Sequence, residues 1–155
     1  MNQRSPIIGV IGSGQCESTI YQLAEEVGQE IARKGAVLVC GGLGGVMEAA
    51  AKGASSAGGL TVGILPGPSI NSANSFIKIP VATDMGQARN VIIAHTADAL
   101  VAVAGGAGTL SEIGHALKSG KPIVGLQTIP DIRGVHYVDN AQEAITRLFE
   151  LIYSP

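Results

Sequence analysis

The stretch Ala99–Gly120 decides the fold of this chain; it reads ALVAVAGGAGTLSEIGHALKSG. The apolar run Ala99–Ala104 predicts a buried strand, and the segment Gly105–Thr109 (GGAGT) predicts a tight turn into a helix. A strand, a glycine turn and a helix start together direct free backbone N–H groups at an anion. The turn lacks the lysine of a Walker loop and the spacing of a GxGxxG fingerprint. We therefore interpret it as a phosphate-binding turn of another kind.

The same order of strand, glycine turn and helix occurs twice before this stretch. Short apolar runs bounded by turn residues predict strands at Ile7–Ile11, Ala36–Cys40, Leu60–Leu65, Phe76–Ala82, Ala99–Ala104, Pro122–Gln127 and Val135–Val138. Helical spacing predicts helices at Cys16–Lys34, at Val46–Ala57, from Thr83 or Asp84 through Arg89 to Thr96, from Gly106 onward, and from Asp139 or Asn140 to Ile152. We expect one Rossmann-like α/β domain over residues 1–155, a doubly wound, mainly parallel sheet with helices on both faces. Pro80 favours an edge position for its strand.

Composition excludes several classes of function. The chain has 155 residues, of which 46% are hydrophobic and 14% charged, and its net charge is −2. This balance argues against a nucleic-acid or anionic-membrane partner, and no apolar run reaches the roughly 18–20 residues of a membrane span. Cys16 and Cys40 have no CxxC spacing, so we expect two reduced thiols in a cytoplasmic protein with no metal and no resident cofactor. The nearly all-apolar segment Val91–Ala94 predicts a homodimer or a dimer of dimers.

Three glycine turns are expected to meet at one edge of the sheet, because the carboxyl ends of parallel strands lie together. Glycines at these positions would suit either tight strand-to-helix turns or close approach of the backbone to a phosphate, and three turns together favour the phosphate. An acidic residue that could hold a ribose is missing after the second strand, which disfavours a standard NAD site. The candidate ligand-binding residues are Gly12, Ser13, Gly14, Gly41, Gly42, Gly44, Gly45, Met47, Gly105, Gly106, Ala107, Gly108 and Thr109.

Two charged residues are the candidates for chemistry at this edge. Glu112 lies one helical turn inside the helix that follows the third glycine turn, and Arg89 lies one strand earlier. The carboxylate would suit proton transfer or a ribose contact, and the guanidinium would suit a phosphate. The alternatives are a carboxylate that only complements the helix dipole and an arginine solvated at a helix end.

The segment Ala104–Glu112 (AGGAGTLSE) resembles the PGGxGTxxE motif of the LOG family, Rossmann-like proteins also described as lysine decarboxylases. Cys40–Met47 (CGGLGGVM) is similar to the GGGxxGLM stretch of that family, and Asp84–Arg89 is similar to its M-x-x-R-K segment. Characterised members are cytokinin nucleoside 5′-monophosphate phosphoribohydrolases. The resemblance implies that Arg89 and Glu112 are the catalytic pair and that the glycine loop with Thr109 binds a 5′-phosphate. Nothing marks a pyridoxal-phosphate lysine, so we expect no lysine decarboxylase.

The departures from the motif favour another branch of the family. Ala104 replaces the proline, and Asn90 replaces the lysine that follows the arginine. The short chain is similar to a small bacterial subgroup close to the molybdenum-cofactor carrier protein, which binds a phosphorylated ligand. We therefore expect binding of a phosphorylated nucleotide-like ligand, either a nucleoside monophosphate or a pterin-type cofactor. The alternative is phosphoribohydrolase activity through Glu112 and Arg89.

Overall fold

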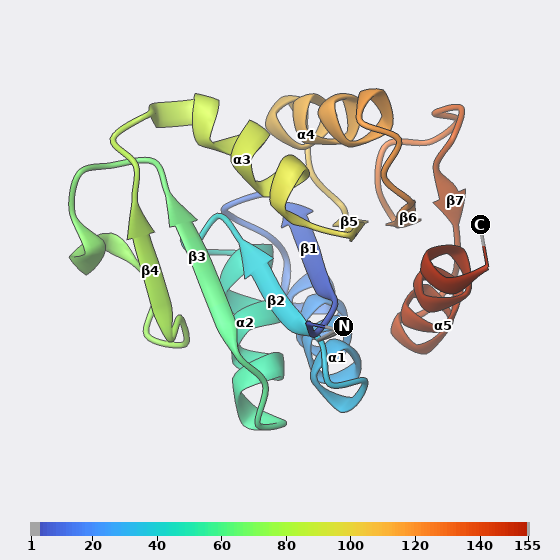
Figure 1. Ribbon diagram of the computed structural model, residues 1–155, viewed down its shortest axis with the longest axis horizontal. Helices are drawn as coiled ribbons and strands as arrows, with labels where there is room; N and C mark the ends of the chain where they lie inside the picture. The colour runs from blue at the N-terminus through green and yellow to red at the C-terminus, as the bar shows by residue number, and fades with distance from the viewer. Residues whose placement is uncertain (1–3, 155) are drawn as a thin grey trace.

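The computed structural model describes residues 4–154, which form a seven-stranded sheet between two layers of helices (Figure 1). The strands are β1 (Ile7–Gly12), β2 (Val37–Cys40), β3 (Thr61–Leu65), β4 (Ile79–Ala82), β5 (Ala99–Val103), β6 (Ile123–Leu126) and β7 (His136–Tyr137). The helices are α1 (Ser18–Arg33), α2 (Val46–Ser56), α3 (Arg89–Thr96), α4 (Ala107–Lys118) and α5 (Ala141–Tyr153), with 3-10 turns η1 (Ile70–Ser72) and η2 (Gly86–Ala88). The expected Rossmann-like α/β fold is confirmed.

The strand order is β4-β3-β2-β1-β5-β6-β7, and every pairing is parallel. All five residues of β5 are buried, as an apolar strand covered on both faces requires. Pro80 lies in β4 at the edge of the sheet, where a missing N–H costs no ladder hydrogen bond. The order reverses between β1 and β5, so the crevice at their carboxyl ends is where a ligand is expected.

The helices divide into two layers that bury the two faces of the sheet. Helices α1, α2 and α5 pack on one face around Val10, Leu38 and Val101, whereas α3 and α4 cover the other around Ile11 and Leu100 (Figure 1). Helices α1 and α2 approach closely because Gly28 and Gly53 have no side chain. A Cβ atom at Gly28 would lie 2.0 Å from the Ala50 carbonyl oxygen. The two layers fix the helix starts on either side of the crevice.

The helix expected from Thr83 or Asp84 begins later than predicted. Asp84 has a φ of 53°, and η2 intervenes before α3 begins at Arg89. The Thr83 hydroxyl donates to the Leu65 carbonyl oxygen at 2.6 Å, so this residue is tied to β3 instead of forming the start of a helix. As a consequence Arg89 is the first residue of α3 and lies at the carboxyl edge of the sheet.

The apolar segment of α3 is less buried than expected. Ile93 and Ala94 are buried against the sheet, while Val91 and Ile92 are only half-buried. Cys16 and Cys40 both carry free thiols. Among residues 4–154, no helix combines the length and the apolar character needed to cross a bilayer. The homo-oligomer suggested by the α3 segment stays a prediction.

Candidate functional site

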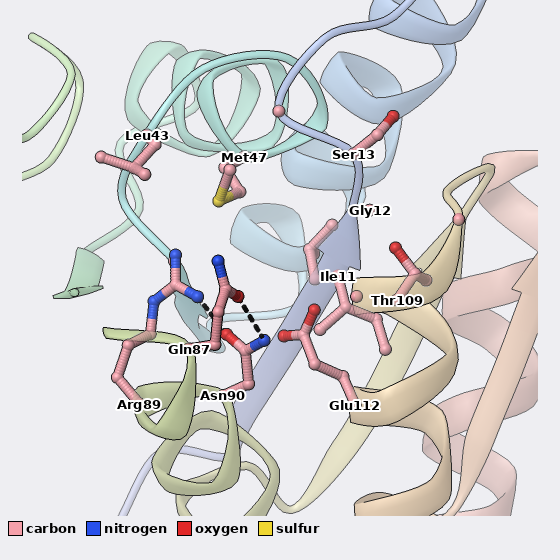
Figure 2. A pocket seen from close by; sticks show the side chains of 15 residues that line it. Ile11, Gly12, Ser13, Leu43, Met47, Gln87, Arg89, Asn90, Thr109 and Glu112 are labelled. Carbon is pink, nitrogen blue, oxygen red and sulfur yellow. Dashed lines mark hydrogen bonds between the residues drawn. The ribbon is translucent and has the colours of Figure 1, made fainter. Parts of the chain in front are cut away.

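A cavity of about 370 Å³ opens at the reversal point of the sheet, between the carboxyl ends of β1, β2 and β5 (Figure 2). Its volume lies within the range of roughly 300–1,000 Å³ typical of small-ligand sites. The cavity is lined by Val10, Ile11, Gly12, Ser13, Gly14, Gly41, Leu43, Met47, Gln87, Arg89, Asn90, Gly106, Gly108, Thr109 and Glu112. All three glycine turns therefore reach one cavity.

The N-terminus of α4 forms one wall of the cavity and has no side-chain cap. The first helical hydrogen bond runs from the Leu110 amide to the Gly106 carbonyl oxygen. Within residues 4–154 the amides of Ala107, Gly108 and Thr109 lack a partner from a loop or a capping side chain, as is usual for the first turn of a helix. These N–H groups and the helix dipole favour an anion at this position.

The turn before α4 is held in a left-handed conformation. Ala104 has a φ of 49° and Gly105 a φ of 101°. The Thr128 hydroxyl, in the loop after β6, donates to the Ala104 carbonyl oxygen at 2.6 Å and so holds the turn in place. A proline cannot adopt this φ, because its ring holds φ near about −65°. The alanine that departs from the family motif therefore accompanies a turn that excludes proline.

Arg89 reaches the cavity from the opposite wall, and its side chain is only 6% exposed. Its Nε donates to the Ile64 carbonyl oxygen at 2.8 Å, which anchors the guanidinium to β3. A Cβ atom on Gly41 would lie 2.7 Å from Nη2 of Arg89, so Gly41 leaves the room that the guanidinium occupies. Burial lowers the pKa of Arg89 and the Glu112 carboxylate raises it, yet an arginine keeps its proton in proteins.

The guanidinium carries a buried charge without an ion pair. The ion pairs found within residues 4–154 lie on the surface, and none includes Arg89 or Glu112. Among the described residues that line the cavity, Arg89 is the only cation and Glu112 the only carboxylate. A buried charge without a counterion is costly, so this arginine is prepared for an anionic or acceptor-rich ligand.

Asn90 and Gln87 form a hydrogen-bonded relay with Arg89 (Figure 2). Arg89 Nη1 donates to Oδ1 of Asn90, which is itself buried. Asn90 Nδ2 in turn donates to Oε1 of Gln87 at 3.3 Å. Asn90 occupies the place of the family's lysine, and in this chain it holds its neighbours in position instead of contributing a charge.

Glu112 projects from α4 into the cavity and is 8% exposed. No hydrogen bond involves its carboxyl group among the described residues. Burial raises the pKa of Glu112 to about 7, and the charge of Arg89 lowers it only in part. A carboxyl group with this pKa exists in both protonation states near neutral pH, which suits proton transfer.

The structure brings together most of the residues predicted to bind or react. Both candidates for catalysis line the cavity, together with the predicted residues Gly12, Ser13, Gly14, Gly41, Met47, Gly106, Gly108 and Thr109. The predicted residues Gly42, Gly44, Gly45, Gly105 and Ala107 do not appear in its lining. Gly42 and Gly45 have positive φ and serve close packing: a Cβ atom on Gly45 would lie 2.3 Å from the Ser13 carbonyl oxygen.

Five further residues of the lining escaped the sequence analysis as ligand-binding candidates: Val10, Ile11, Leu43, Gln87 and Asn90. The substitution of the family's lysine by Asn90 was a usable signal, because it pointed to a changed environment around Arg89. Gln87 gave no such signal, since it falls in a turn that the sequence assigned to a helix. The roles of all these residues in ligand binding stay predictions.

The model of the SLOG cluster4 family matches residues 5–150. The chain belongs to this family. A protein of Archaeoglobus fulgidus is 54% identical over 138 residues, which make up 89% of this chain and 91% of that one. A cytokinin riboside 5′-monophosphate phosphoribohydrolase of Mycobacterium tuberculosis is 37% identical over 115 residues. The match covers 68% of this chain and 61% of that enzyme.

Solved structures of proteins named for the molybdenum cofactor are similar to this member of the SLOG cluster4 family. The molybdenum cofactor binding protein from Rippkaea orientalis superposes with a TM-score of 0.90 at 36% identity, covering 99% of this chain and 100% of that one. The molybdenum cofactor carrier protein of Chlamydomonas reinhardtii gives a TM-score of 0.90 at 40% identity, covering 97% and 100%. The resemblance to the LOG family and to the carrier subgroup is confirmed.

Proposed function

We propose that this protein binds a phosphorylated ligand of the pterin or nucleotide type in the cavity between β1 and β5. One observation carries the proposal: the uncapped N-terminus of α4 and the unpaired guanidinium of Arg89 face the same cavity. The phosphate would accept hydrogen bonds from the amides of Ala107, Gly108 and Thr109. The remainder of the ligand would extend toward Arg89 on the opposite wall.

The similar structures support a pterin-type cofactor as the cargo. Two proteins named for binding or carrying the molybdenum cofactor match nearly the whole chain at 36% and 40% identity. The residues present fit the organic part of such a cargo, because the cavity offers amide donors for a phosphate and side-chain donors for a ring. In this function the protein binds and releases its cargo without breaking a bond.

A second function is favoured by Glu112. Its carboxyl group is buried beside a guanidinium in the same cavity, and burial raises its pKa to about 7. In the protonated form it would give a proton to the leaving base as the N-glycosidic bond breaks. The oxygen of a water molecule would bond to C1′ of the ribose, and the proton that this water loses would return to the Glu112 carboxylate. The products would be the free base and ribose 5-phosphate. The hydrolase from Mycobacterium tuberculosis supports this alternative.

The experiment compares binding and turnover in the same samples. Ribose 5-phosphate and a panel of nucleoside monophosphates are added to the wild-type protein and to Glu112→Gln, while the melting temperature and the released base are measured. Binding without turnover predicts a higher melting temperature with phosphorylated ligands and no free base from either protein. Release of base by the wild type but not by Glu112→Gln would establish hydrolysis. A melting temperature that no phosphorylated compound changes would contradict the binding site itself.

A further inference from the structure

The hydrogen-bonding polarity of the wall opposite α4 is fixed by Arg89. A guanidinium has five N–H donors and no acceptor. Asn90 must therefore turn its Oδ1 toward Arg89, which leaves its Nδ2 to donate to Gln87. Gln87 must turn its Oε1 toward Asn90, and its own amide nitrogen is left free. Three side chains are thus oriented in sequence by one group that can only donate.

Each side-chain acceptor of the relay already accepts one hydrogen bond. Oδ1 of Asn90 and Oε1 of Gln87 accept within the relay, and the Ile64 carbonyl oxygen accepts from Arg89 Nε. Two nitrogens of this wall, Nη2 of Arg89 and Nε2 of Gln87, make no hydrogen bond at all among the described residues. Figure 2 shows the free nitrogens of both side chains on the side of Met47, away from Asn90. We call these two groups the donor edge.

We propose that the donor edge selects a ligand ring that presents a carbonyl oxygen beside a ring nitrogen. Guanine and pterins present this pair of acceptors, whereas adenine presents an amino group in place of the oxygen. An amino group facing Arg89 and Gln87 would leave donors on both sides without partners, and unpaired polar groups reduce affinity strongly. The inference rests on the proposed function, because the phosphate at α4 is what brings the ring to this wall.

The donor edge assigns different roles to the three side chains. Arg89 and Gln87 would contact the ring, and Asn90 would act as a positioning residue that keeps the Gln87 amide nitrogen facing the ligand. Gln87 lines the cavity and is solvent-exposed, so its amide would rotate freely without the hydrogen bond from Asn90. Because Asn90 is buried and touches both neighbours, a change of its amide alters the polarity of the donor edge without emptying the core.

The test is calorimetric titration of the full chain with guanosine monophosphate, adenosine monophosphate and ribose 5-phosphate. We expect the wild type to bind the guanine nucleotide about tenfold more tightly than the adenine nucleotide. Ribose 5-phosphate, which lacks the heterocyclic base, reports on the phosphate site alone. Chromatography of the same samples detects any released base, and where release occurs all proteins are compared in the Glu112→Gln background.

Two variants separate recognition from folding. Gln87→Glu places acceptors where the donor was, so we expect the preference for the guanine nucleotide to be lost or reversed while the affinity for ribose 5-phosphate is kept. Asn90→Asp can no longer donate to Gln87, and we expect the ratio of the two affinities to fall toward one. Gln142→Glu, the same chemical change on an exposed residue of α5, should leave the ratio unchanged.

The outcomes distinguish this inference from the proposed function. Binding of ribose 5-phosphate with equal affinities for the two nucleotides, or a ratio that both variants leave intact, would overturn the donor edge and keep the phosphate site. Failure of all three compounds to bind would overturn the proposed function. If Asn90→Asp lowers the affinity for all three compounds by the same factor, Asn90 supports the fold and does not set specificity.

Discussion

The β2–α2 loop and the β5–α4 loop look alike in sequence, and the structure uses them differently. Both are glycine-rich turns at the same edge of the sheet, and each leads into a helix. The first amide of α2, at Val46, already donates to the Ser13 carbonyl oxygen at 3.0 Å. Within residues 4–154 the start of α4 has no comparable partner, and Cβ atoms on Gly106 or Gly108 would meet nothing described within 4 Å.

The role of a glycine turn depends on what lies where a side chain would be. In the β2–α2 loop, a Cβ atom on Gly42 or Gly45 would collide with neighbouring residues, so glycine there permits close packing. In the β5–α4 loop the space beside Gly108 belongs to the cavity, so glycine there leaves room for a ligand. Of the two helix starts, α4 is therefore the one available to a phosphate.

The largest expected effect is on stability and contrasts these two loops. Gly45→Ala would place Cβ 2.3 Å from the Ser13 carbonyl oxygen at a φ of 61°, and we expect the free energy of unfolding to fall by about 3 kcal/mol or more. Gly108→Ala should change it by less than about 1 kcal/mol and should weaken binding of ribose 5-phosphate. Urea unfolding and calorimetry check both variants. Equal losses of stability in the two variants would contradict the different roles assigned to the two loops.

The second largest effect is a change of stability with pH, and it comes from the carboxyl group of Glu112 in α4. Burial raises the pKa of Glu112 from 4.5 to about 7, so the folded chain binds this proton more tightly than the unfolded chain. The contribution of Glu112 to the stability of the wild type should therefore fall by about 3 kcal/mol as the pH rises from 4.5 through 7. Glu112→Gln should be as stable as the wild type near pH 5 and more stable at pH 8. Parallel pH profiles in urea unfolding would show that the carboxyl group is not buried as described.

Gly41 differs from the other glycines of the β2–α2 loop discussed above, because it lines the cavity. A Cβ atom there would lie 2.7 Å from Arg89 Nη2 and 2.6 Å from Met47 Sδ. Both atoms belong to side chains and not to the backbone, so Gly41→Ala should cost only about 1–2 kcal/mol of stability. Displacement of the guanidinium should reduce affinity for guanosine monophosphate by about tenfold. If calorimetry shows that Gly41→Ala binds guanosine monophosphate as tightly as the wild type does, Arg89 does not contact the ligand.

The smallest expected effect tests the turn that begins the β5–α4 loop. Ala104 has a φ of 49°, which glycine adopts without strain. Ala104→Gly should raise the free energy of unfolding by about 1 kcal/mol, and Ala104→Pro should lower it, because proline cannot adopt a positive φ. Thermal and urea unfolding measure both changes. A stabilising proline would mean that the turn resembles that of the family motif after all.

Much of the fold was predictable because its signals are local. Apolar runs ended by glycines located the strands, and Pro80 placed β4 at the edge. The predicted start of α3 was wrong, because the hydrogen bond between Thr83 and β3 is a tertiary contact that no sequence pattern indicates. The presence of Arg89 and Glu112 in one cavity was predictable, because both were expected at the same edge of the sheet. The relay through Asn90 and Gln87 was not, because it depends on which atoms of three side chains meet.

The most direct test of the phosphate site follows backbone amides by NMR while ribose 5-phosphate is added to the protein. We expect saturable shifts of the amide resonances of Ala107, Gly108 and Thr109, because these N–H groups would donate to the phosphate. Val46, whose amide is already bound to Ser13, should shift little. Large shifts at the start of α2 with none at the start of α4 would contradict the account.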